Sequence, residues 1–157
     1  MFKTLAVVAV STALSVLSPT LLARDFASVR VVPTELTWRD MGEGVQFAPI
    51  TGSERTEGVY VYRVTFPKGH RNVPHIHSDE RVITVLQGSL YIGYGSIFDE
   101  QNMKKLTAGS VFTEPKDQPH YVWAKDETVV IQVTGTGMSR RTYVEQVAHI
   151  EAIEAIE

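Results

Sequence analysis

The chain has 157 residues, 43% of them hydrophobic, which is the size and composition of one globular domain with its own core. Its net charge is -3, and the sequence contains no long run of charged residues of one sign. We therefore expect no binding to nucleic acid. The absence of cysteine excludes disulfides and thiolate ligands, so a metal site has to use nitrogen and oxygen donors.

The first 23 residues have the pattern of a secretory signal peptide. Lys3 precedes a stretch without charged residues, and Pro19 and Thr20 interrupt this stretch shortly before Ala23. The pattern favours cleavage after Ala23, export to a periplasm or the cell exterior, and no stable membrane insertion afterwards. A membrane anchor is the alternative, because about twenty apolar residues can span a bilayer. The serines and Pro19 weaken that alternative.

The rest of the chain has the pattern of an all-β single domain. Residues 24–58 lack a helical period and predict an extended N-terminal arm with short strands and turns. Six segments rich in β-branched and aromatic residues then predict strands at 59–66, 81–86, 89–95, 110–115, 120–125 and 128–135. Short strands at this spacing predict a sandwich or barrel over 59–145, with 146–157 as a C-terminal tail. The pair of residues 87 and 88, Gln-Gly, suits a tight hairpin.

Two histidines one residue apart, His75 and His77, stand out in the middle of the chain. Alternate side chains of a strand share a face, so both imidazoles can point at one position. His120, on a later predicted strand, can add a third imidazole. Each histidine alone has a structural explanation, but the combination indicates a metal site.

These segments resemble a known family. Residues 69–88, GHRNVPHIHSDERVITVLQG, resemble the first motif of the cupins, and residues 109–124, GSVFTEPKDQPHYVWA, resemble the second. In the second motif Pro115 and His120 fall in the family's places, while Asp117 and Ala124 replace the usual glycine and asparagine. The resemblance implies a double-stranded β-helix, the cupin jelly roll, with a divalent metal held inside it by three histidines and one glutamate.

The glutamate is out of place. The family pattern has it four residues after the second histidine, where this chain has Arg81. Strand alternation agrees, because it puts Arg81 on the histidine face and Glu80 on the opposite face. A bend at residues 78 and 79, or a bulge further along, would let Glu80 face inward, and the ligands would be His75, His77, Glu80 and His120. Alternatively Arg81 points inward, and the site has three histidine ligands or is an anion pocket without metal.

Imidazoles with one carboxylate suit Mn, Fe, Ni, Co, Cu or Zn better than Ca or Mg. Tyr62, Arg81 and Trp123 are candidates for a substrate pocket beside the metal. The resemblance implies an exported metal-dependent enzyme, a dioxygenase, isomerase or decarboxylase acting on a small organic molecule. Non-catalytic binding of a sugar or an organic acid is the alternative. Association through sheet edges, giving a homodimer, is a further expectation from the resemblance.

Overall fold

The computed structural model describes residues 28–145, and the predicted signal peptide and C-terminal tail lie outside this range. Within it the chain forms eleven β-strands and two short 3-10 helices, η1 (Pro33–Glu35) and η2 (Glu100–Asn102). Among the residues described, no helix has the length and apolar character needed to cross a membrane.

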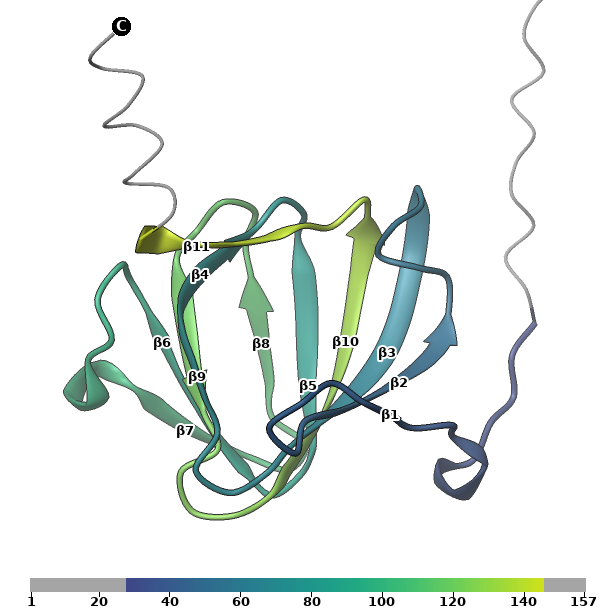
Figure 1. Ribbon diagram of the computed structural model, residues 1–157, viewed down its shortest axis with the longest axis horizontal. Coiled ribbons are helices and arrows are strands. Elements are labelled where there is room, and N and C mark those ends of the chain that lie inside the picture. Colours follow the sequence, from purple (N-terminus) through teal and green to yellow (C-terminus); the bar gives the residue numbers. More distant parts are fainter. Residues whose placement is uncertain (1–27, 146–157) are drawn as a thin grey trace, which may run out of the picture.

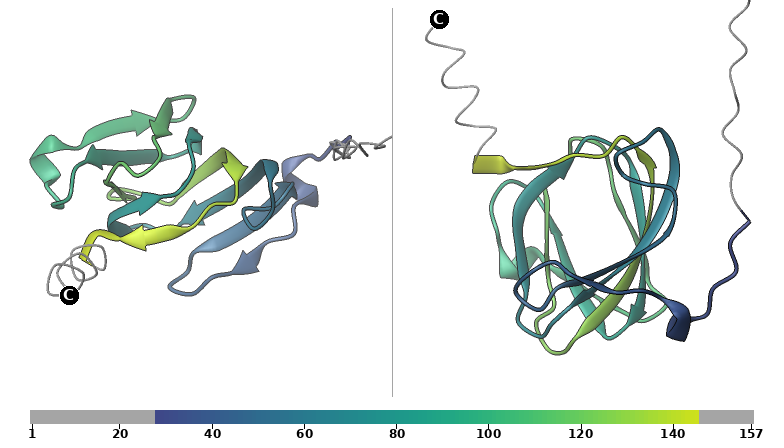
Figure 2. Two further views of the ribbon diagram at one scale, coloured as in Figure 1. Left: turned by 90° about the horizontal axis from the view of Figure 1, so that it is seen from above. Right: turned by 45° about the vertical axis from the view of Figure 1, so that its right-hand side comes forward.

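The strands form two antiparallel sheets that curve around one interior (Figures 1 and 2). The six-stranded sheet contains, in order, β1 (Arg39–Asp40), β2 (Gln46–Thr51), β3 (Gly58–Phe66), β10 (Val129–Gly137), β5 (Arg81–Gln87) and β8 (Val111–Glu114). The five-stranded sheet contains β11 (Arg141–Tyr143), β4 (Arg71–His77), β9 (His120–Trp123), β6 (Ser89–Tyr94) and β7 (Lys104–Thr107). The predicted all-β jelly roll is confirmed.

The six strands predicted from composition are β3, β5, β6, β8, β9 and β10, and their ends differ from prediction by at most two residues. Within residues 28–58 the chain forms η1, β1, β2 and the first residue of β3. β2 pairs with β3 and extends the six-stranded sheet. The segment between the strands predicted at 89–95 and 110–115 contains η2 and also β7.

The predicted hairpin at Gly88 is wrong. β5 and β6, on either side of it, belong to different sheets and are not paired with each other. Gly88 has a φ of 75°, and a Cβ atom there would lie 2.5 Å from the carbonyl oxygen of Thr128. Glycine is therefore required where the chain passes from one sheet to the other.

The core lies between the two sheets. Alternate residues of the strands point inward and exclude water from the interior. The inward residues include large side chains from both sheets, among them Tyr60, Ile83, Val85, Val133, Leu90 and Ile92. A cluster of buried polar and charged side chains is also enclosed by the strands, and it contains the predicted histidines.

Candidate metal centre

Three imidazoles from two neighbouring strands converge at this cluster. His75 and His77 are alternate residues of β4, and His120, the first residue of β9, is the Cα partner of His75. All three side chains are buried, and their ring centroids lie 4.4 to 5.4 Å apart. Each ring offers a nitrogen within 4.8 Å of a nitrogen of the other two. The structure therefore brings together all three histidines that the sequence singled out.

Backbone carbonyls orient two of the rings. His75 Nδ1 lies 2.8 Å from the Val73 carbonyl oxygen, and His120 Nδ1 lies 3.0 Å from that of Gln118. Because a carbonyl only accepts, each Nδ1 carries the proton and each Nε2 keeps its lone pair. His120 Nε2 is buried and has no hydrogen-bond partner. A buried nitrogen lone pair without a partner, within reach of two other imidazoles, fits a divalent transition metal.

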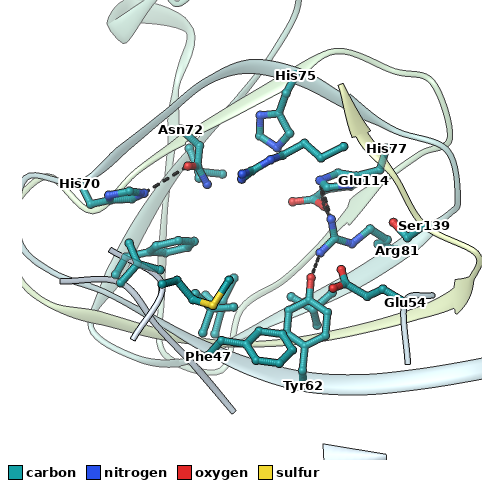
Figure 3. A pocket seen from close by; sticks show the side chains of 18 of the residues that line it. Phe47, Glu54, Tyr62, His70, Asn72, His75, His77, Arg81, Glu114 and Ser139 are labelled. Atoms are coloured by element: carbon teal, nitrogen blue, oxygen red, sulfur yellow. Dashed lines mark hydrogen bonds and ion pairs between the residues drawn. The ribbon is translucent and has the colours of Figure 1, made fainter. Parts of the chain in front are cut away.

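A buried ion pair completes the cluster. Arg81 Nη1 lies 3.4 Å from Glu114 Oε2, and it also donates to His77 Nε2, while Nη2 donates to the Tyr62 hydroxyl (Figure 3). Glu114 Oε1 lies 3.4 Å from His120 Nε2, and Oε2 lies 3.8 Å from His77 Nε2. One carboxylate therefore contacts the guanidinium and two of the three imidazoles.

The surroundings lower the pKa values of His75, His77 and Glu114. Burial, and then the charge of His120 when protonated, lower the pKa of His75 to about 4. Burial, and then Arg81, lower the pKa of His77 to about 2. Burial would raise the pKa of Glu114, but Arg81 and His120 outweigh it and lower that pKa to about 2. These shifts favour neutral imidazoles at His75 and His77 and an ionised carboxyl group at Glu114, which are the protonation states that metal ligands require.

Glu80 is not part of the cluster. Its side chain is exposed, whereas Asp79 and Arg81 on either side of it are buried. Burial alternates without interruption from Arg81 to Val85, and the irregular register between β5 and β10 comes only after Val85. The prediction that Glu80 faces the histidines is therefore wrong, and Arg81 takes the inward position.

The turn between β4 and β5 explains this outcome. The Tyr60 hydroxyl donates a 2.5 Å hydrogen bond to Asp79 Oδ2, and both side chains are buried. Gly135 permits the contact, since a Cβ atom there would lie 2.3 Å from the Tyr60 hydroxyl oxygen. Because this bond holds Asp79 inward, the alternation of the chain turns Glu80 outward and Arg81 inward.

A cavity of about 660 Å³ lies beside the cluster (Figure 3). Tyr62 and Arg81, two of the three predicted pocket residues, line it together with His75 and His77. Trp123 is not among the lining residues, so its predicted place in the pocket is wrong.

Strand alternation accounts for the position of Trp123. Val122 lines the cavity, and the next side chain of β9 therefore points to the other face of the sheet. There the Arg71 guanidinium lies 3.7 Å from the Trp123 ring centroid, and the Phe98 ring centroid lies 6.2 Å from it. Trp123 thus packs against Arg71, which itself lines the cavity, and against Phe98.

Glu114 was not predicted to lie beside the histidines. It stands directly before Pro115 in the second motif, inside a segment predicted as a strand. An inward-facing arginine requires a buried partner, and an acidic residue on a predicted strand is the natural candidate. The sequence contains such acidic residues, but only the strand pairing identifies which of them faces Arg81.

Comparisons with known proteins agree with the two motifs. The family model described as a cupin domain matches residues 62–134. A putative germin-like protein 2-1 of Oryza sativa subsp. japonica is 36% identical over 81 residues, covering 50% of this chain and 37% of that protein. Auxin-binding protein 4 of Zea mays is 32% identical over 117 residues, covering 70% of this chain and 57% of that protein. The chain thus spans between about a third and somewhat over half the length of these relatives.

A solved structure supports the same fold. The crystal structure of an RmlC-like cupin from Shewanella frigidimarina superposes with a TM-score of 0.57 at 18% sequence identity, covering 72% of this chain and 94% of that one. At this identity the likeness concerns the fold alone. Together with the family match and the two motifs, it identifies the chain as a small cupin-type domain.

Proposed function

We propose that the chain is a metal-binding cupin in which His75, His77 and His120 hold one divalent transition-metal ion, and that it acts as an enzyme on a small organic molecule. The observation that carries the proposal is the convergence of three buried imidazoles, two of which, those of His75 and His77, line a cavity. The metal is one of Mn, Fe, Ni, Co, Cu or Zn, because imidazole nitrogen is a donor that these ions accept and that Ca and Mg disfavour.

A bound ion would supply a Lewis acid or a redox centre at this wall. The chain itself supplies the imidazoles, a cavity large enough for a small organic molecule, and polar groups that orient it. Tyr62, Arg81 and Arg141 line the cavity together with His75 and His77. Oxidoreductase or isomerase chemistry on a small substrate fits this arrangement.

Non-catalytic binding of a sugar or an organic acid is the second candidate function. Among the described residues that line the cavity, the buried ionisable ones all contact one another in or beside the cluster: Tyr62, His75, His77, Arg81 and Glu114. No buried group therefore remains separate to act as a general base. One relative is named as an auxin-binding protein, which favours the same alternative.

Metal content tests the proposal. The purified protein is stripped with a chelator, reconstituted with each of the six ions in turn, and analysed by mass spectrometry for bound metal. We expect one ion per chain, lost in His75→Ala and retained in the control His70→Ala. His70 also lines the cavity, but its Nε2 pairs with the Asn72 side chain at 3.1 Å. Absence of stoichiometric metal from the wild type under all six conditions would overturn the proposal.

Turnover separates the enzyme from the binding protein. The metal-loaded protein is screened against small organic acids and sugars by thermal stabilisation, and each stabilising compound is then followed by mass spectrometry. Conversion that is lost in His75→Ala supports the enzyme. Stabilisation without any product supports the binding protein.

Export is proposed from residues 1–23 alone. We expect the mature protein in the periplasmic or extracellular fraction, beginning at Arg24. Its N-terminal sequence, read from the fractionated protein, checks this. An uncleaved chain in the membrane fraction would support the anchor instead.

The homodimer also remains a prediction. The outermost strands of the two sheets are β1 and β8, and β11 and β7, and an unpaired edge strand can accept a neighbour. Sedimentation of the purified protein distinguishes a monomer from a dimer.

A further inference from the structure

We propose that Glu114 supplies the carboxylate ligand of the metal centre, so that this chain has exchanged the positions of a carboxylate and a guanidinium across two paired strands. The inference rests on the proposed metal-binding function. Glu80, the glutamate nearest in sequence to the histidine pair, is exposed and cannot take this part.

The first step is the register of β5 and β8. Arg81 and Glu114 are Cα partners in this antiparallel pair. Residues directly opposite each other on antiparallel strands project from the same face. Position 114 is therefore the position on β8 directly opposite Arg81, and its side chain faces the same region. Both side chains are buried there, 5% and 6% exposed.

The second step is the distance between donor atoms. An ion bound at about 2.1 Å by nitrogen and oxygen can join two donors that are at most about 4.2 Å apart. The Glu114 oxygens lie 3.4 Å from His120 Nε2 and 3.8 Å from His77 Nε2. Both separations are within this limit. Glu114 Oε2 and His120 Nε2 are also buried without a hydrogen-bond partner, so two donor atoms within one site are free to bind.

The charges of Arg81 and Glu114 favour the same assignment. A guanidinium beside a divalent ion repels it, and imidazole ligands carry no negative charge that could offset that repulsion. The Glu114 carboxylate does, and it already lies against Arg81. Arg81 has to release His77 Nε2 when that nitrogen binds the ion, but it can keep the Tyr62 hydroxyl and one carboxylate oxygen. Arg81 is then a positioning residue that orients Glu114.

The test compares Co²⁺ binding by isothermal titration and by the visible absorption spectrum of the bound ion. Four variants of the full chain are compared with the wild type: Glu114→Gln, Glu114→Asp, the matched control Glu80→Gln, and the exchange Arg81→Glu/Glu114→Arg. The aspartate variant and the exchange variant retain both charges, which keeps the comparison valid if Glu114→Gln fails to fold. Circular dichroism reports the folding of each.

We expect Glu114→Gln to weaken Co²⁺ binding by at least about tenfold and Glu80→Gln to leave it unchanged. Glu114→Asp should shift the absorption spectrum, because the ligand oxygen moves by the length of one methylene. The exchange variant should bind one ion, since it returns a carboxylate to position 81. An unchanged spectrum in Glu114→Asp together with unchanged affinity in Glu114→Gln would overturn this inference alone. Absence of Co²⁺ and other metals from the wild type would overturn the proposed function as well.

Discussion

Arg81 and Glu114 are register partners across β5 and β8, and their side chains form an ion pair that is almost completely buried. Burying two charges is costly, and their attraction offsets that cost only while both are present. Removing one charge leaves the other without compensation in the interior. The pair is therefore expected to be far more sensitive to single substitutions than to a double one.

A double-mutant cycle tests this coupling. Arg81→Met and Glu114→Gln should each lower the free energy of unfolding of the metal-free protein by about 3 to 5 kcal/mol. The double variant should lose much less than the sum, because neither charge remains. Urea denaturation measures all four proteins.

The exposed pair of Arg71 and Glu100 provides the control cycle. Its atoms are 3.2 Å apart, but the two side chains are 46% and 47% exposed. Solvent screening limits such a pair to about 0 to 1 kcal/mol. Additive losses in the Arg81 and Glu114 cycle would mean that the two charges are not coupled in the interior.

The buried histidines predict acid sensitivity of the metal-free protein. The pKa of His75 is about 4 in the folded protein, and an unfolded histidine titrates near 6.5. The unfolded state therefore takes up a proton first, so this stabilisation is fully present above pH 6.5 and is lost as the pH falls toward 4. Over this interval each such histidine changes the free energy of unfolding by up to about 1.4 kcal/mol per pH unit.

The lowered pKa values of His77 and Glu114 also reduce the stability of the folded protein as the pH falls. The pKa of His77, about 2 in the folded protein, adds a second histidine slope below pH 6.5. The folded pKa of Glu114 is also about 2, so its stabilisation is present above about 4.5 and is lost as the pH falls further. Urea denaturation at several pH values measures the slope, and His75→Gln should reduce it between pH 6.5 and 4.5. A stability that does not change over that interval would contradict the prediction.

The sequence alone was sufficient to predict the fold and the convergence of the three histidines. The alternation of β-branched and polar residues identifies the strands locally, and His75 and His77 share a strand face whatever the rest of the chain does. His120 could be added because the second motif has a recognisable spacing around Pro115. These features depend on residues that are close together in the sequence.

Which carboxylate lies beside the three histidines could not be predicted in the same way. Whether Glu80 or Arg81 faces inward depends on Asp79, whose partner is Tyr60 on another strand. The role of Glu114 depends on the register between β5 and β8. Both are contacts between distant segments, and a single residue of register reverses every side chain of a strand. The hairpin expected at Gly88 failed for a related reason, because a glycine marks a turn without saying which sheet the chain enters next.

Trp123 provides a test of which residues belong to the cavity. Its ring packs against Arg71 and Phe98 and is not among the residues that line the cavity, and its Nε1 has no hydrogen-bond partner. Trp123→Phe should therefore leave metal content and ligand binding unchanged and lower the free energy of unfolding by roughly 1 to 2 kcal/mol through lost packing. Metal analysis and urea denaturation of the variant check both parts. A changed ligand affinity with unchanged stability would place Trp123 functionally in the pocket.

The hydrogen bond between Tyr60 and Asp79 gives the last prediction, because it determines which way residues 80 and 81 face. Tyr60→Phe removes the donor and leaves Asp79 Oδ2 buried without it, and Asp79 Oδ1 already has no partner. An unsatisfied buried group costs about 1 to 3 kcal/mol, or more when it is charged. We expect that loss of stability, together with weaker metal binding as Asp79 turns toward solvent and Arg81 loses its fixed position.

Tyr91→Phe is the matched control, since the Tyr91 hydroxyl also donates to an aspartate, Asp126, but at an exposed site where water replaces the bond. It should change stability by less than about 0.5 kcal/mol and leave metal binding intact. Urea denaturation and Co²⁺ titration of the two variants give the comparison. Equal effects of the two substitutions would show that the Asp79 bond does not fix the turn, and the orientation of Arg81 would then depend on its pairing with Glu114 alone.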